Sequence, residues 1–115
     1  MSFKAQHHWI LQRLSAVLLV FLYPFLLLWF YQQRSLDYEE LIVVLQGPYS
    51  LALMAASIGV AIYHAALGLQ IIIDDYVTNL SIRRIFLVTM KGFAFALCLL
   101  AFFFLFKIKT LEISL

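Results

Sequence analysis

Three long apolar stretches, separated by shorter polar ones, dominate the pattern of this chain. A helix that crosses the roughly 30 Å hydrocarbon core of a bilayer needs about 20 mainly apolar residues. The three stretches reach that length and predict membrane spans over roughly residues 12–31, 49–73 and 85–106. The predicted fold is therefore an all-α membrane protein with three transmembrane helices, in a single domain that covers residues 1–115.

Two connections join the predicted spans. Residues 32–47 are polar at first and then apolar, a pattern typical of a short amphipathic segment at the membrane surface. Residues 74–84 form the tighter connection. Pro24 lies inside the first predicted helix and is expected to kink it, whereas Pro48 suits the first turn of the second helix, where its missing N–H costs nothing.

Composition excludes several classes of protein. Hydrophobic residues make up 65% of the chain and charged residues 12%, whereas a soluble domain has roughly 45–50% and about 25%. The excess apolar surface must face lipid or other subunits. The net charge of +2 is small and scattered, so we expect no nucleic-acid partner. One cysteine, Cys98, allows neither an internal disulfide nor an iron–sulfur cluster held by this chain alone.

The distribution of lysine and arginine predicts the orientation, because these residues accumulate in cytoplasmic loops. The side with the N-terminus and residues 74–84 carries Lys4, Arg13, Arg83, Arg84 and, by snorkelling, Lys91; the other side carries Arg34, Lys107 and Lys109. We therefore expect a cytoplasmic N-terminus and a periplasmic C-terminus. The opening residues resemble neither a signal peptide nor a mitochondrial presequence, so we expect a complete chain in a bacterial inner membrane.

Ionisable residues inside a bilayer are costly and commonly functional. His64 lies well inside the second predicted span, and Gly68 follows it by one helical turn on the same face. A histidine beside a glycine leaves room for a flat macrocycle, and haem iron accepts imidazole as an axial ligand. The alternative is a histidine that hydrogen-bonds to a neighbouring helix, and the spacing alone leaves both open.

Asp75 lies eleven residues after His64, which is three helical turns plus about 20°, so both side chains share one face roughly 16 Å apart. Asp74 and Asp75 lie at the C-terminal end of a helix, where the dipole disfavours negative charge. They predict a proton-delivering or hydrogen-bonding site, with Tyr76 supplying a phenol O–H. The alternative is a polar turn whose carboxylates pair with Arg83 or Arg84.

Arg13 lies one or two turns into the first predicted span. It is interpreted either as the partner of an anion, such as a haem propionate, or as a side chain that snorkels to the lipid headgroups.

The opening residues 9–16, Trp-Ile-Leu-Gln-Arg-Leu-Ser-Ala, and the pattern His64, Gly68, Asp75, Tyr76 resemble the hydrophobic membrane anchor subunits (D-type) of bacterial succinate dehydrogenase, respiratory complex II. The resemblance covers nearly the whole chain. It implies half of a heterodimeric anchor bundle, in which a second anchor subunit (C-type) supplies the other half. The additional Asp74 departs from the family pattern and offers a second carboxylate for the family role.

The resemblance also implies functions for these residues. His64 would be one axial ligand of a haem b shared with the partner anchor, Gly68 would pack against the haem, and Tyr76 with Asp75 would bind ubiquinone near the cytoplasmic surface. Arg13 would lie near the haem propionates or the quinone. An iron–sulfur subunit and a flavoprotein subunit would carry the remaining redox groups, so this chain would catalyse nothing alone.

Three other functions remain open. The chain could be the anchor of a related quinol:fumarate reductase, a structural or assembly protein of the membrane without a cofactor, or a proton channel that uses His64 and Asp75.

Overall fold

The computed structural model describes residues 3–113, all of whose regular structure is helical. The helices are α1 (Phe3–Gln32), α2 (Tyr38–Leu45), α3 (Pro48–Tyr76) and α4 (Leu80–Thr110). Three of them, α1, α3 and α4, are long and apolar enough to cross a membrane, as predicted. Each is about 45 Å long, so its ends extend beyond a hydrocarbon core of about 30 Å. Residues 1–2 and 114–115 of the predicted domain lie outside the described part.

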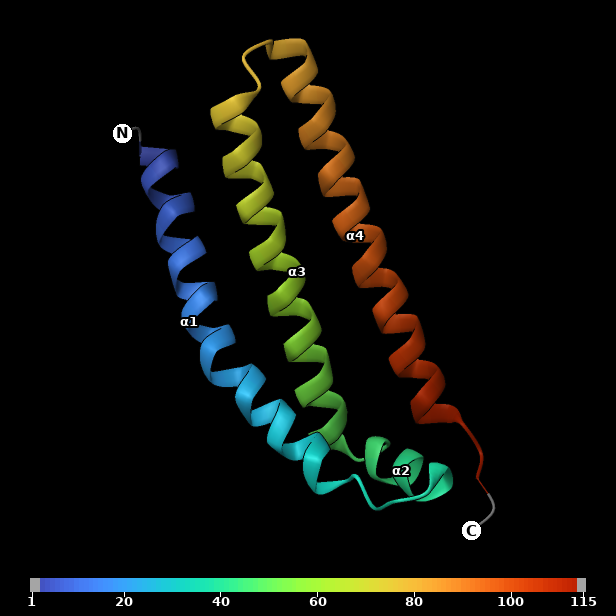
Figure 1. Cartoon of the computed structure of the whole chain (residues 1–115). Helices are drawn as coiled ribbons and strands as arrows, with labels where there is room; N and C mark the ends of the chain where they lie inside the picture. Colours follow the sequence, from blue (N-terminus) through green and yellow to red (C-terminus); the bar gives the residue numbers. More distant parts are fainter. Residues whose placement is uncertain (1–2, 114–115) are drawn as a thin grey trace.

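Helix α3 lies between the other two long helices (Figure 1). It packs against both α1 and α4, whereas α1 and α4 make no contact with each other within residues 3–113. The start of α1 and the connection between α3 and α4 lie at one end of the bundle, and α2 lies with the end of α4 at the other (Figure 1). The charged groups assigned to one side of the membrane therefore do share an end.

Local sequence explains where the helices begin. Asp37 and Glu40 form a reciprocal capping box at the start of α2, and Asn79 Oδ1 accepts hydrogen bonds from the first backbone N–H groups of α4. Pro48 occupies the first turn of α3. Helix α1 continues through Pro24, which membrane helices tolerate.

Helix α2 is the short segment predicted between the first two spans. Its Ile42 and Leu45 are buried, which fixes one apolar face of α2 against the bundle. The next residue, Gln46, donates from Nε2 to the carbonyls of Ile108 at 2.9 Å and Leu111 at 2.6 Å. These carbonyls lie at the end of α4, where helical partners run out, so Gln46 ties the first connection, residues 32–47, to the C-terminal end of α4.

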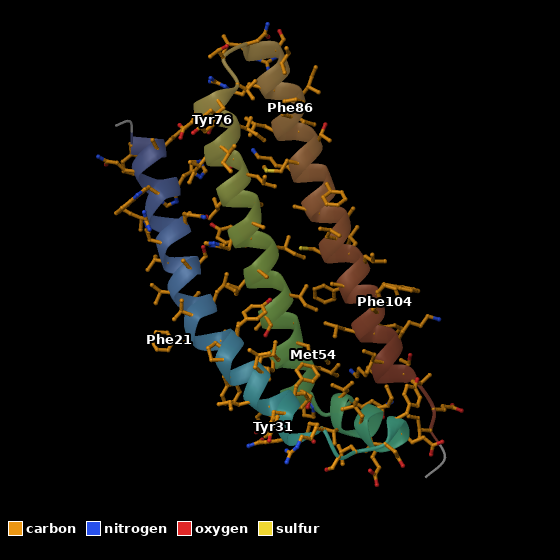
Figure 2. All side chains as sticks on the ribbon, viewed as in Figure 1. Phe21, Tyr31, Met54, Tyr76, Phe86 and Phe104 are labelled. Atoms are coloured by element: carbon orange, nitrogen blue, oxygen red, sulfur yellow. The ribbon has the colours of Figure 1, made fainter. Side chains whose placement is uncertain are left out.

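Little of the chain is buried by its own fold. Large apolar side chains such as Phe21 and Phe104 point away from the bundle, with 75% and 55% of their surface exposed (Figure 2). Within residues 3–113 the buried polar residues are three serines, Ser15, Ser50 and Ser57. Small side chains at helix contacts and apolar ones outside are typical of membrane helices. The outer surface is therefore suited to lipid or to other membrane subunits.

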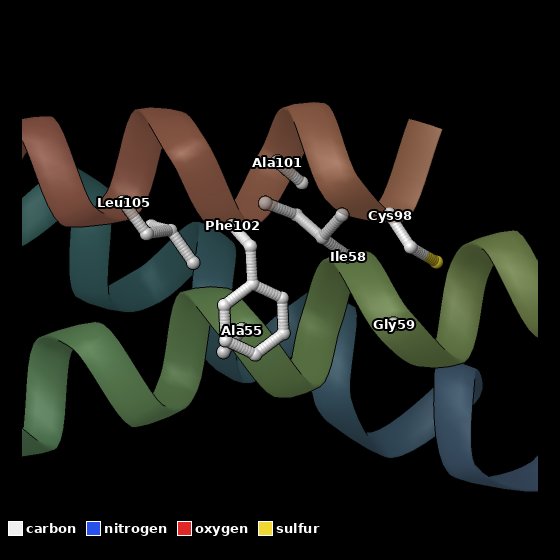
Figure 3. Close-up of a pocket in the computed structure, with 7 residues that line it drawn as sticks. All are labelled: Ala55, Ile58, Gly59, Cys98, Ala101, Phe102 and Leu105. Carbon is white, nitrogen blue, oxygen red and sulfur yellow. The ribbon is translucent and has the colours of Figure 1, made fainter. Parts of the chain in front are cut away.

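Helices α3 and α4 leave a small apolar cavity of about 50 Å³ between them (Figure 3). Cys98 lines it from α4 and Gly59 from α3. Cys98 is thus a small apolar side chain at a helix contact, and the residues around it offer no second thiol or charged group.

Candidate functional site

His64 lies at the contact between α3 and α1. Its Nδ1 atom is 2.8 Å from the hydroxyl oxygen of Ser15, a residue of α1 that is 49 positions earlier in the chain. Ser15 is only 3% exposed, and His64 is half-buried. A hydrogen bond between two helices, which the sequence left as an alternative to haem ligation, is therefore present.

The partners of Ser15 decide which imidazole nitrogen carries the proton. The Ser15 hydroxyl has a single hydrogen and donates it to the backbone carbonyl of Gln12 at 2.9 Å. A carbonyl can only accept, so the second bond of this hydroxyl must be one that it accepts. His64 therefore donates from Nδ1–H, and Nε2 keeps its lone pair.

The remaining nitrogen of His64 is accessible. Within residues 3–113, Nε2 makes no hydrogen bond, and it does not belong to the enclosed polar atoms that lack a partner. A half-buried imidazole with one nitrogen bonded and the other free is the arrangement found in histidines that bind metals. The donor set therefore fits an axial ligand of haem iron.

Gly68 faces α1 as well. A Cβ atom built on Gly68 would lie 3.2 Å from Nε2 of Gln12, closer than an ordinary van der Waals contact. The space beside Gly68 is thus filled by a side chain of the same protein. The lack of a side chain at residue 68 allows α1 and α3 to approach, a role that the sequence did not predict. Packing of Gly68 against haem stays a prediction.

Within residues 3–113, two polar atoms of α1 are enclosed and have no hydrogen-bond partner: Oε1 of Gln12 and Nδ1 of His8. His8, Gln12 and Ser15 follow one another at intervals of four and three residues, so they lie on one face of α1. Unpartnered buried polar groups are uncommon in proteins. This end of the contact between α1 and α3 therefore has unused hydrogen-bonding capacity.

Asp75 and Tyr76 lie at the C-terminal end of α3 and are exposed, Tyr76 by 79%. Figure 2 shows Tyr76 at the end of the bundle where α1 begins. Neither aspartate pairs with an arginine within the described residues. Arg83 instead donates from Nε to the carbonyl of Val77 at 2.8 Å. The two carboxylates and the phenol are therefore free of partners from this part of the chain and can reach a ligand or another subunit.

Arg13 is exposed, and its guanidinium lies 5.4 Å from the ring centroid of Trp9, one helical turn earlier. A cation over an indole face is favourable by roughly 0.5–1 kcal/mol at an exposed site. The fold does not bring Arg13 into contact with His64 or Asp75. Its predicted role toward a haem propionate or a quinone thus requires a group from outside the chain.

Sequence reasoning missed the polar contacts that join α1 to α3. Besides Ser15 and Gln12, Tyr23 donates from its hydroxyl to the carbonyl of Ser57 at 3.1 Å. The contacts pair residue 12 with 68, 15 with 64 and 23 with 57, which is the register of two antiparallel helices. A signal was present, since polar side chains inside a span usually face the bundle interior.

Comparison with known proteins bears on this arrangement. A family model described as "Succinate dehydrogenase/Fumarate reductase transmembrane subunit" matches residues 3–106, which include α1, α2, α3 and most of α4. The chain belongs to this family. As a member, it is a membrane anchor subunit of a succinate dehydrogenase or fumarate reductase, and the resemblance identified from the helix motif is confirmed.

Curated relatives of this anchor subunit come from several Rickettsia species, and each is described as a succinate dehydrogenase hydrophobic membrane anchor subunit. The protein from Rickettsia bellii is 32% identical over 91 residues, 79% of this chain and 73% of the relative. That from Rickettsia felis is 26% identical over 90 residues, 78% of this chain and 75% of the relative. The protein from Rickettsia prowazekii is 24% identical over 92 residues, 80% of this chain and 74% of the relative. No solved structure gave a significant match.

Proposed function

We propose that this anchor subunit belongs to a bacterial succinate:ubiquinone oxidoreductase, binds haem b through His64 and forms part of the ubiquinone reduction site with Tyr76 and Asp75. The observation that carries the proposal is the pair of hydrogen bonds at Ser15, which leaves the Nε2 lone pair of His64 free. A histidine of the partner anchor subunit would hold the haem together with His64. The haem, when bound, supplies a one-electron redox centre inside the bilayer.

The quinone site is proposed at the end of α3 where Tyr76 and Asp75 are exposed. Reduction of a quinone to a quinol takes up two electrons and two protons. The Tyr76 hydroxyl would donate a hydrogen bond to a quinone carbonyl and hold it in place. Asp75 would pass protons from the aqueous side toward that carbonyl. The electrons would come from a flavoprotein subunit through an iron–sulfur subunit, since this chain has one cysteine and no nucleotide-binding motif.

The distribution of lysine and arginine supports a cytoplasmic location of the quinone site, which this arrangement needs. The end of the bundle with Tyr76 also holds the larger share of lysine and arginine, which favours the cytoplasm. Soluble subunits that deliver electrons would dock at that end, beside the quinone. Arg13, placed near the same end, would serve an anion there, either a haem propionate or a charged group near the quinone.

A related fumarate reductase is the second candidate, because the family description covers both enzymes. The two differ in the quinone they use and in the working direction of the reaction. This difference gives a measurement that separates them.

The proposal is tested by purifying the complex from membranes through a C-terminal tag on this chain. We expect a flavoprotein, an iron–sulfur subunit and a second hydrophobic anchor to copurify, and we expect ubiquinone to support succinate oxidation. Turnover with menaquinone alone would assign the anchor to a fumarate reductase. Recovery of the chain without the soluble subunits would overturn the proposal.

A further inference from the structure

We propose that Ser15 is the positioning residue of the haem ligand: by accepting a hydrogen bond from Nδ1–H of His64, it fixes the tautomer that presents Nε2 to the iron. This inference rests on the proposed function, because it concerns the same haem. It assigns a role to a residue of α1, whereas the ligand itself belongs to α3.

The orientation of the Ser15 hydroxyl is fixed from within α1. Its hydrogen is held by the carbonyl of Gln12, three residues earlier, at 2.9 Å. Such bonds to a carbonyl of the preceding turn are available to serine and threonine in helices. The oxygen lone pairs therefore face α3, where the imidazole lies. In the opposite tautomer Nδ1 would carry only a lone pair, so the Ser15 hydroxyl would have to turn to donate to it and would lose its bond to the Gln12 carbonyl.

Burial makes this preference strong. Ser15 is 3% exposed, so water cannot easily replace it as the acceptor of the Nδ1 proton. A buried donor left without a hydrogen-bond partner is destabilising. Loss of the acceptor would free the imidazole to rotate or to change tautomer. Either change would move the Nε2 lone pair away from the direction that the fold provides.

A general packing role does not explain these contacts. Ser57 is an equally buried serine in the same helix contact, 2% exposed, and its hydroxyl donates to the Leu53 carbonyl of its own helix at 2.6 Å. It makes no bond to an imidazole. The two serines have the same size and the same membrane setting and differ in the histidine contact. Ser57→Ala is therefore a matched control for Ser15→Ala.

The partner of a ligand histidine also tunes the metal. An acceptor at Nδ1–H makes the imidazole a stronger donor to iron and stabilises the ferric state, and removal of such a partner typically lowers metal affinity 10–100-fold. We expect the complex with Ser15→Ala to lose haem, and the haem that remains to have a higher midpoint potential. Ser15→Thr keeps the hydroxyl and should behave as wild type.

The experiment compares purified wild-type complex with Ser15→Ala, Ser15→Thr and Ser57→Ala. It measures haem per complex, the midpoint potential by redox titration and the ferric EPR g-values, which respond to the orientation of the ligand ring. Changes in Ser15→Ala alone support the proposal. If Ser15→Ala does not assemble, Ser15→Cys replaces it, because a thiol of similar shape is a weak acceptor and should shift the same quantities.

Failure of the positioning role and failure of the proposed function give different outcomes. If the Ser15→Ala complex has the same haem content, midpoint potential and EPR g-values as wild type, the positioning role is overturned and the proposed function stays intact. Equal changes in Ser15→Ala and Ser57→Ala would overturn it too, because they would reflect packing. A wild-type complex without haem would overturn the haem part of the proposed function itself.

Discussion

The side-chain amide of Gln12 on α1 lies 3.2 Å from the point that a Cβ atom on Gly68 of α3 would occupy. Alanine at residue 68 therefore forces the amide to move by a few tenths of an ångström. At Gly59 of the same helix nothing lies within 4 Å of the corresponding Cβ position, so alanine there meets no atom of this chain. The two glycines belong to the same helix and differ in the atoms that lie near the Cβ position.

We expect Gly59→Ala to raise the thermal stability of the solubilised complex, because alanine is favoured over glycine in a helix by roughly 0.5–1 kcal/mol. Gly68→Ala should show no such gain in thermal stability, or should lower it. The double variant, Gly68→Ala with Gln12→Ala, should show the gain. Thermal unfolding of the three variants checks this. A defect of Gly68→Ala that persists without the Gln12 side chain would show that something else, such as the haem, fills the space.

Tyr76→Phe removes a phenol O–H from the exposed end of α3 and leaves the ring in place. A hydrogen bond of this kind contributes about 0.5–1.5 kcal/mol, so we expect the KM for ubiquinone to rise about 2- to 13-fold. The haem spectrum should not change, because Tyr76 lies three turns from His64. Steady-state kinetics with a soluble ubiquinone analogue measures the effect.

The matched control for that measurement is Tyr49→Phe. Tyr49 is 91% exposed and lies in the first turn of the same helix, at the other end of the bundle. Its removal should leave ubiquinone kinetics as in wild type. Equal effects of the two variants, or none for Tyr76→Phe, would argue against a quinone contact at Tyr76.

The two neighbouring aspartates should differ in function. Asp75 shares the face of His64, to within about 20°, whereas Asp74 is rotated by about 80° from His64. If Asp75 delivers protons to the quinone, Asp75→Asn should lower turnover at least tenfold, since positioned proton transfer typically contributes 10²–10⁴-fold. Asp74→Asn should stay near wild type. The reverse order in ubiquinone turnover would move the role to Asp74.

Sidedness can be tested by cysteine labelling in a Cys98→Ser background. Ser35 and Thr78 are exposed residues in the two connections, at opposite ends of the bundle. In intact cells, a membrane-impermeant maleimide should label Ser35→Cys, and Thr78→Cys should react only after the cells are opened. Labelling in the opposite order would place Tyr76 on the periplasmic side, away from the proposed electron donors.

Hydropathy predicted the long helices because a bilayer imposes a minimum length on each span, and composition records that constraint directly. The helices are longer than the predicted spans, since their ends carry polar residues such as Lys4 and Asp75 that hydropathy assigns to water. The short helix α2 was foreseen only as an amphipathic segment. Its start at the capping box of Asp37 and Glu40 was not predicted, and its contact with α4 through Gln46 is tertiary.

The site was less accessible to sequence reasoning. His64, Gly68 and Asp75 could be placed on one face, because helical periodicity relates residues of the same helix. That Ser15 would meet His64 depends on the antiparallel register between α1 and α3, and periodicity contains no such information. A serine inside a predicted span indicates a side chain that faces the bundle interior, but it does not indicate which residue that side chain meets. The resemblance drew attention to residues 9–16 but assigned no function to Ser15.

The most direct test of the account is a reduced-minus-oxidised visible spectrum of the purified complex, with wild type beside His64→Ala. Succinate and dithionite serve as separate reductants. The samples contain equal amounts of complex, measured by their flavin content. We expect a b-type α-band in wild type that is lost or shifted in His64→Ala. A wild-type complex without that band, or an identical band in the variant, would contradict haem ligation by His64.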